Sequence, residues 1–329
     1  MIRRALFNFL AATIGLSTIP SGVYGADAVR IFRIGILIPE SALGESQTIK
    51  GIREQLRDLG YIEGKNLVLD LRDLQGDRSA LYAAASELVN KKVDVLFATG
   101  SRATEAAKVA TKQIPIVFRH PADPVAVGLL KNMKRPDGNV TGVAAFSSDM
   151  NQKRLEILKT IVPKLRKIHI FYDANSKYSA ENLLPVQQAA AKLRLEVVGH
   201  PIKASDGIEN SLEKLQAGNG EGIVQVPDDL VESQASFLFD AAKKLRLATM
   251  FDHESWAIKG SLATYGPNYA RMGRQAAEII DKLLKGAKPK DVPVQAAGKF
   301  DLVINLRTAH IIGLNIPSEV LDKADRVIR

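Results

Sequence analysis

The sequence predicts an α/β fold with two lobes, each built on a doubly wound parallel sheet. Short apolar runs that contain β-branched residues alternate along the chain with segments of helical periodicity. Strand starts recur roughly every 20 to 35 residues, a spacing that favours parallel strands joined by right-handed helical crossovers. The series runs twice, the second time from about residue 168, and 329 residues suffice for two cores.

The first series opens with the run 33–38 (RIGILI), which is continuously apolar, as buried parallel strands are. The segment 47–59 has apolar residues at helical spacing and ends at Gly60. The other expected strands of this half are 67–71, 93–98, 114–118 and 140–143. The other expected helices are 78–90, one that starts at Ala103, and one that follows Pro124.

The second series follows a helix over 149–161, which ends before Pro163. Its expected strands are 168–172, 195–198, 222–226, 248–251 and 261–264. Its expected helices are 180–193, 207–216, 230–245 and 271–284. The tail predicts a strand over 300–304, a helix over 308–312 and a short helix after Pro317, and this tail must dock on a lobe already formed.

The first residues have the composition of an export signal. Arg3 and Arg4 precede an apolar stretch over 5–19, and small residues follow it. We expect a signal peptide over 1–28, cleaved after Gly25 or after Ala28, and an uncleaved N-terminal anchor is the alternative. The exported mature chain is then expected to be soluble and periplasmic, with free secretion as the other possibility.

Composition narrows the classes of function. The chain has no cysteine, so it offers no lipid-bearing thiol, disulfide or thiolate chemistry. The formal net charge is +9, but Lys and Arg are interleaved with Asp and Glu and no aromatic residues accompany the basic cluster 164–167. This pattern is typical of solvated helix faces, and we expect no nucleic-acid partner.

Motifs for covalent or cofactor chemistry are missing from the sequence. The glycines at 64 and 100 lack the partners of a phosphate-binding loop, and there is no G-x-S-x-G motif. His120 with Asp123, and His253 with its acidic neighbours, lack a further metal ligand at the usual spacing. We therefore predict no cofactor, no metal and no enzymatic activity, although a hydrolase that uses a strand-end aspartate as acid or base stays open.

Polar residues follow several of the expected strands. Ligands of open α/β sheets bind outside the carboxyl ends of the strands, and a helix N-terminus there suits an anion. Gly100 and Ser101 stand between a strand and a helix in this way, although Ser101 is equally well explained as an ordinary helix cap. Trp256, the only tryptophan, is expected either to stack on a ligand or to cover the core of its lobe.

Several short segments together resemble the ABC transporter substrate-binding proteins described as binding tryptophan or other aromatic amino acids. These segments span nearly the whole mature chain: 98–101 (ATGS), 123–129, 138–143 (GNVTGV), 271–289, 303–309 and 313–317. The resemblance implies a periplasmic-binding-protein fold of type I, with a hinge of three crossovers near 142–147, 265–268 and 294–300. Lobe 1 would then hold 29–143 plus 268–295, and lobe 2 would hold 144–267 plus 296–329.

The resemblance also implies where a ligand is bound. Ser101 and Thr104, with the helix N–H groups, would hold a ligand carboxylate, and acidic residues of the cleft would take an amine. The full set expected to line the cleft is Glu40, Ser41, Gly100, Ser101, Thr104, His120, Asp123, Phe146, Asp173, Asn175, Asp228, Asp252, Trp256 and Tyr265. Arg102 and Arg119 add positive charge to the loops of the first lobe, which favours a more acidic ligand unless Arg102 faces solvent.

On this basis we expect the periplasmic solute-binding component of an ABC importer. It would be a monomer that carries a small amino-acid-like or carboxylate ligand to a membrane permease powered by an ATPase. The alternatives are an exported α/β enzyme and a ligand-sensing lobe that signals to a membrane receptor.

Overall fold

The computed structural model describes residues 30–39, 43–75, 77–120, 123–125, 128–145, 147–175, 177–203, 207–213, 215, 220–226 and 228–329. Ile31–Arg329 forms one unit. The signal peptide expected over 1–28 lies outside the described residues. Within them, no helix combines the length and the apolar character that crossing a bilayer requires.

The first sheet holds six of the described strands in the order β11-β5-β4-β3-β1-β2, all parallel. Their bounds are β1 (Phe32–Ile38), β2 (Leu67–Asp73), β3 (Val95–Thr99), β4 (Ile116–His120), β5 (Val140–Ala144) and β11 (Gln295–Ala296). Helices α1 (Leu43–Asp58), α2 (Leu81–Asn90), α3 (Gly100–Ala110) and α10 (Tyr269–Leu284) cover this sheet. Short 3-10 turns lie at Arg78–Ala80 and Pro289–Asp291.

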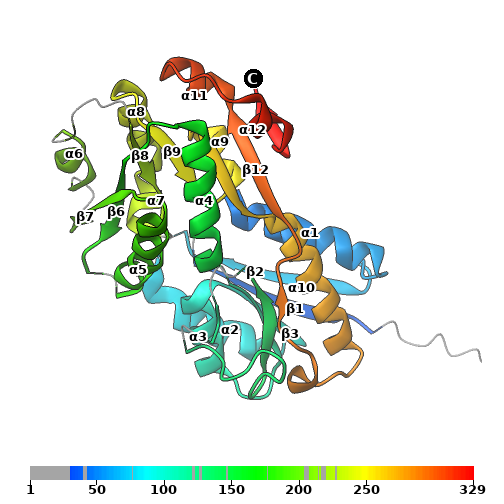
Figure 1. Ribbon diagram of the computed structural model, residues 1–329. Helices are drawn as coiled ribbons and strands as arrows, with labels where there is room; N and C mark the ends of the chain where they lie inside the picture. The colour runs from blue at the N-terminus through cyan, green and yellow to red at the C-terminus, as the bar shows by residue number, and fades with distance from the viewer. Residues whose placement is uncertain are drawn as a thin grey trace, which may run out of the picture. The chain divides into compact units, whose positions relative to one another are not determined.

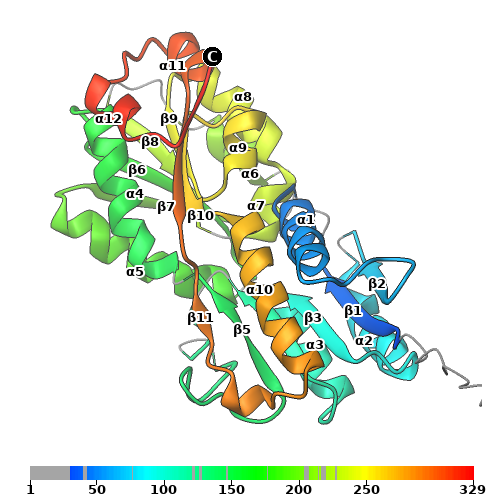
Figure 2. The same cartoon turned by 90° about the vertical axis from the view of Figure 1, so that its right-hand side faces the viewer.

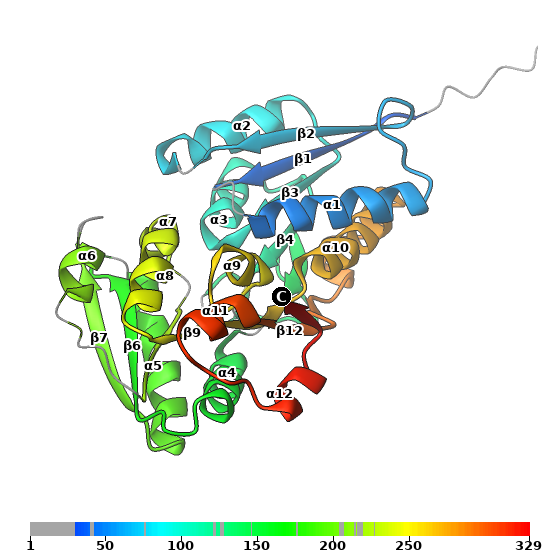
Figure 3. The same ribbon diagram turned by 90° about the horizontal axis from the view of Figure 1, so that it is seen from above.

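Both faces of the first sheet are buried, which explains the continuous apolar runs of its strands. Alternate side chains such as Ile34, Ile36 and Phe97 pack with α1 and α10, whereas Leu37 and Leu96 pack with α2 and α3. Figure 3 shows α1 and α2 on opposite sides of β1 and β2. The first lobe is thus a sheet between two helical layers.

The second sheet holds seven of the described strands in the order β13-β12-β10-β9-β8-β6-β7. Their bounds are β6 (Lys167–Asp173), β7 (Glu196–Ile202), β8 (Glu221–Val224), β9 (Ala248–Phe251), β10 (Ala263–Pro267), β12 (Phe300–Asn305) and β13 (Arg326–Ile328). The pairs are parallel except β10 with β12, which is antiparallel. The prediction of two parallel-sheet α/β lobes is confirmed, except that β12 and β13 run opposite to the other five strands of the second sheet.

The helices of the second lobe pack on both faces of this sheet. One core cluster includes residues of α4 (Ser147–Ile161), α5 (Lys177–Lys192), α11 (Leu306–Ile311) and α12 (Ser318–Asp322). The other includes residues of α6 (Gly207–Leu212), α7 (Asp229–Ser233), α8 (Ala235–Lys244) and α9 (Glu254–Lys259). Figure 1 shows α4, α7 and α8 around β6, β8 and β9, and α11 and α12 near the end of β12.

The chain passes between the two sheets at three places. It leaves the first sheet after β5 to form α4, returns from β10 to α10, and leaves again from β11 to β12. Figure 2 shows the last passage as one extended path from β11 into β12. The lobe boundaries predicted from the resemblance stay a prediction.

The helix expected after Pro124 is wrong for the described residues. The backbone forms turns there, with Leu129 and Leu130 both donating to the Pro124 carbonyl. Gly128 has a φ of 71°, which ends a right-handed turn, and the Lys131 N–H donates to the Asp137 side chain instead of a helical carbonyl. Three elements were not predicted: α9, β11 and β13.

Candidate functional site

The loops after β3 and β4 meet, as their place in neighbouring parallel strands predicts. Ser101 Oγ and His120 Nε2 share a hydrogen bond of 2.5 Å, and the His120 side chain is 2% exposed. Gly100, whose φ of 76° suits glycine, starts α3 directly after the strand, and the N-cap residue Thr99 makes no side-chain capping bond. Ser101 and His120 therefore stand at the N-terminal end of α3, where the helix dipole favours negative charge.

Two predicted residues of this lobe already use their polar groups inside the protein. The Thr104 side chain is completely buried, and its hydroxyl donates to the Gly100 carbonyl at 2.6 Å. An Asp123 oxygen accepts the Val125 N–H at 2.8 Å, which holds the turn after β4. Thr104 thus supports the first turn of α3 from within, and its contact with a ligand carboxylate stays a prediction.

In the second lobe, Asp173 and Asp228 lie together at the ends of β6 and β8. Asp228 is 4% exposed, and one of its oxygens accepts the Asp173 N–H at 2.8 Å. The other oxygen accepts the Val231 N–H at 3.1 Å and so caps α7. Asp173 in turn accepts the N–H of the exposed Asn175 at 2.8 Å. Asp228 therefore carries a structural task, which a strand-end position alone does not reveal.

Asp252 directly follows β9 and is 6% exposed. Its N–H donates to the Gln225 side chain at 3.1 Å, and the Trp256 indole donates to its carboxylate. Burial raises the pKa of Asp252, while the charges of Arg154 and Arg119 act against that rise. This carboxylate is buried in a region of low polarity, so it suits an ammonium partner.

Trp256 belongs to the core of the second lobe. It is 6% exposed, and its ring centroid lies 6.0 Å from that of Phe251 and 6.3 Å from that of Phe239. Of the two predicted roles, the structure favours core packing, with the indole N–H directed to Asp252. Tyr265 stands one strand further, half-buried beside Phe300.

Sequence reasoning did not identify Tyr269, the first residue of α10, as part of the site. The Arg119 guanidinium carbon lies 4.4 Å from the centroid of the Tyr269 ring. The His253 ring stacks on the same tyrosine, with centroids 4.4 Å apart and planes 17° apart. Arg119 belongs to the first sheet and His253 follows a strand of the second, so Tyr269 joins the two lobes through its ring.

His253 is held in a structural role. Its Nδ1 accepts the Ser255 N–H at 3.2 Å, which caps α9, and burial, with a smaller contribution from Arg119, lowers its pKa to about 3. The ring is therefore neutral at physiological pH. In the part of the chain that the structure describes, no three His, Asp or Glu side chains gather as a metal ion would require.

Arg154 is the second residue that the sequence did not indicate. It lies on α4, is 1% exposed, and is among the largest fully buried side chains of the described residues. Its Nε donates to the Tyr265 carbonyl at 2.7 Å and its Nη1 to Asn151 at 3.3 Å. A helical Arg is normally exposed, so only the structure could reveal it.

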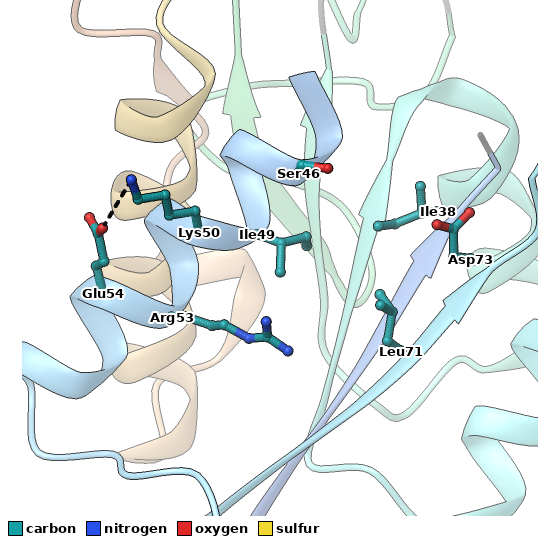
Figure 4. A pocket seen from close by; sticks show the side chains of 8 residues that line it. All are labelled: Ile38, Ser46, Ile49, Lys50, Arg53, Glu54, Leu71 and Asp73. Carbon is teal, nitrogen blue, oxygen red and sulfur yellow. Dashed lines mark ion pairs between the residues drawn. The ribbon is translucent and has the colours of Figure 1, made fainter. Parts of the chain in front are cut away.

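Three predicted residues, Glu40, Ser41 and Phe146, lie outside the described residues. A separate pocket of about 340 Å³ opens between α1 and β2. Its lining residues are Ile38, Ser46, Ile49, Lys50, Arg53, Glu54, Leu71 and Asp73. Figure 4 shows three apolar side chains between Arg53 and Asp73, with the Lys50–Glu54 ion pair on the far side of α1. None of the eleven predicted site residues that the structure describes is among the residues that line this pocket.

Comparison with known proteins places this geometry in a family. The chain is 30% identical over 284 residues to the tyrosine-binding protein of Clostridioides difficile (strain R20291), covering 85% of this chain and 80% of that protein. The solved structure of an ABC domain in complex with L-Trp from Streptococcus pneumonia is 25% identical with a TM-score of 0.79, covering 90% of this chain and 100% of that one.

A ligand-free, open structure of a substrate-binding protein with adhesive properties from Clostridium difficile is 28% identical with a TM-score of 0.73, covering 91% and 99% of the two chains. Sugar-transporter solute-binding proteins and repressor domains share the fold at lower identity. The family model for the ABC transporter substrate binding protein matches residues 33–328. The chain therefore belongs to the family of ABC transporter substrate-binding proteins.

Proposed function

We propose that this protein is the periplasmic solute-binding component of an ABC importer and that it binds an amino acid between its lobes. The observation that carries the proposal is that the residues after the strands of one lobe suit an anion, whereas those of the other lobe suit a cation. Ser101, His120 and the start of α3 in the first lobe suit a carboxylate. The buried carboxylate of Asp252 in the second lobe suits an ammonium group.

We infer that the two sets act on one small ligand, because Arg119 connects them. Arg119, one residue before His120, influences the charge of Asp252 and contacts Tyr269. A zwitterion placed between these sets would satisfy both ends. A dicarboxylate would put a second negative charge next to Asp252, so we infer an amino acid rather than a purely acidic ligand.

The names of two relatives support an aromatic amino acid. One is called a tyrosine-binding protein, and the other was solved with L-Trp. The half-buried Tyr265, on the strand next to Asp252, offers a ring surface to such a ligand. L-tyrosine and L-tryptophan are therefore the first ligands to test.

The remaining parts of the proposal follow from the family and from the signal peptide that the sequence predicts. We infer that a signal peptide directs the chain to the periplasm, that it acts there as a monomer, and that it delivers its ligand to a permease and its ATPase. The other predicted cleft residues, among them Glu40, Ser41, Asp123, Phe146 and Asn175, stay proposals on the same footing.

Isothermal titration of the mature protein with the twenty amino acids tests the proposal, after unfolding and dialysis to remove any bound ligand. We expect L-tyrosine or L-tryptophan to bind, and Ser101→Ala and Asp252→Asn each to weaken binding by on the order of 10-fold. Asp228→Ala is a poor test because that carboxylate caps α7 and holds Asp173. Absence of binding by every amino acid would refute the proposed ligand class.

One observation favours the alternative of an exported enzyme. A serine within 2.5 Å of a histidine nitrogen is the geometry by which hydrolases activate a nucleophile. We infer that here the pair binds a carboxylate, and we expect no release of nitrophenol from nitrophenyl acetate above the rate of the Ser101→Ala variant. Hydrolysis that depends on Ser101 would favour the enzyme instead.

A further inference from the structure

Arg154 and Asp252 are two buried groups of opposite charge on neighbouring elements. β9 and β10 are paired in parallel with Thr264 opposite Phe251, so the next residues in register are Tyr265 and Asp252. Arg154 Nε donates to the Tyr265 carbonyl at 2.7 Å, which places the guanidinium one strand away from Asp252. The backbone contact is close there, since a Cβ on Gly266 would lie 1.5 Å from the Asp252 carbonyl oxygen.

The guanidinium of Arg154 is not fully satisfied. Nη1 donates to Asn151, but Nη2 has no hydrogen-bond partner within the described structure, although the side chain is only 1% exposed. Burying a charge without full compensation is unfavourable, so such a residue is kept for a purpose other than stability alone. The negative group on which it acts most strongly is Asp252.

We propose that Arg154 is a positioning residue for Asp252: it keeps this buried carboxylate ionised and in place to receive the ammonium group of the ligand. The inference rests on the proposed function, and it assigns amine recognition to a residue that does not touch the ligand. Through the Tyr265 carbonyl, the same guanidinium is also bound to β10, the strand that leads into α10.

The groups that face Asp252 show why Arg154 should control its charge. Burial opposes ionisation, the Trp256 indole donates a hydrogen bond, and Arg154 contributes the largest favourable charge, ahead of Arg119. The neighbouring His253 is neutral because its pKa is lowered to about 3, so it does not titrate between pH 6 and 8. Removing Arg154 should therefore move the ionisation of Asp252 to higher pH.

The experiment compares L-tryptophan with indole-3-propionate, which has the same ring and carboxylate but no amine. Binding of both is measured by titration calorimetry from pH 6 to 8 in wild type, Arg154→Met, Arg154→Lys and Lys153→Met. The last is a matched control, since Lys153 is the neighbouring residue on α4 and its side chain is 56% exposed. Thermal unfolding confirms that each variant is folded.

We expect Arg154→Met to weaken L-tryptophan binding by on the order of 10-fold at pH 7, with recovery toward pH 8 and a much smaller effect on indole-3-propionate. Arg154→Lys should keep most of the discrimination, and Lys153→Met should match wild type. In an Asp252→Asn background, Arg154→Met should not weaken L-tryptophan binding further. This comparison of the double variant with Asp252→Asn also tests the proposal if Arg154→Met alone is unstable.

Equal losses of affinity for both ligands at every pH would overturn the positioning role and assign Arg154 to hinge packing. A loss of L-tryptophan affinity in Arg154→Lys as large as in Arg154→Met would do the same. The proposed function would stand in that case, because wild type still binds. If wild type binds neither L-tryptophan nor L-tyrosine, the proposed function fails first and the inference fails with it.

Discussion

His169 connects two other titratable side chains of the second lobe. Its Nε2 lies 2.9 Å from a Glu221 oxygen, and its Nδ1 lies 2.9 Å from His200 Nε2. The His200 ring stacks on Phe171 with centroids 4.8 Å apart. Burial, and then the proximity of His169, lower the pKa of His200 to about 4, so this ring is neutral at pH 7.

The depressed pKa of His200 makes stability depend on pH. The unfolded chain binds this proton more readily than the folded protein does. The contribution of neutral His200 to the free energy of unfolding is therefore complete above pH 6.5 and is lost as pH falls toward 4. After allowance for solvent screening, we expect this contribution to the free energy of unfolding to be about 1 to 2 kcal/mol. Urea unfolding at pH 5 to 7 measures it, since most carboxylates stay ionised in that range.

His200→Gln should flatten the pH dependence of the unfolding free energy in this range. His310→Gln is the control, because His310 lies exposed on α11 and should leave the slope unchanged. A slope in His200→Gln as steep as in wild type would show that another group is responsible, with the buried His253 the first to examine.

At the residue scale, sequence reasoning located strand ends better than it assigned roles. Ser101 and His120 were both expected in the site, and they do meet. Asp228 occupies an equally good position, yet both its oxygens bind backbone N–H groups, a use that depends on how β6 and α7 come together. The sequence did not indicate that Arg154 is buried, because the burial of a helical arginine depends on tertiary packing.

At the scale of elements, α1 and α10 pack at very close range. They lie side by side in Figure 1, and glycines make the approach possible. A Cβ on Gly273 would lie 2.1 Å from the Thr48 carbonyl oxygen, and one on Gly51 would lie 2.0 Å from the Ala270 carbonyl oxygen. Both neighbours are backbone atoms, so neither can move without moving its helix.

Gly273→Ala should therefore destabilise the protein although alanine is the better helix former. The change improves helix propensity by about 1 kcal/mol. We expect the forced separation of the two helices to cost more than that, so that the free energy of unfolding falls by about 2 kcal/mol. Thermal unfolding should show a decrease of roughly 5 °C. Gly298→Ala is the matched control, since its nearest atoms are side-chain atoms 3.9 Å away. A Gly273→Ala protein as stable as wild type would contradict the close packing.

Most elements were predictable because their periodicity is local. The helix expected after Pro124 failed, since the described residues there form turns stabilised by Gly128 and the Asp137 side chain. β11 is two residues long and β13 three, so neither has a pattern that a sequence can show. Both are strands only because a sheet edge is available to them.

At the scale of the whole molecule, the two repeated series predicted two lobes, whereas the exchange of the chain between them could be expected only from the resemblance. Ala144, Pro267 and Ala296 end strands from which the chain passes to elements of the other lobe. Local patterns carry no information about which sheet the next element joins. The contact of Arg119 and His253 with one tyrosine at the start of α10 depends on that exchange.

If the ligand binds between the lobes, binding should draw them together as rigid bodies, because the three passages are short and each lobe has its own core. Small-angle X-ray scattering of the mature protein should then show a smaller radius of gyration with saturating L-tryptophan, while far-UV circular dichroism stays unchanged. Ser101→Ala serves as the control and should need a ligand concentration about 10-fold higher than wild type for the same decrease, in line with its expected affinity. A ligand that binds by calorimetry but leaves the radius of gyration of wild type unchanged would place the binding site outside the inter-lobe region, and the pocket between α1 and β2 would then be the next site to test by substitution of Arg53.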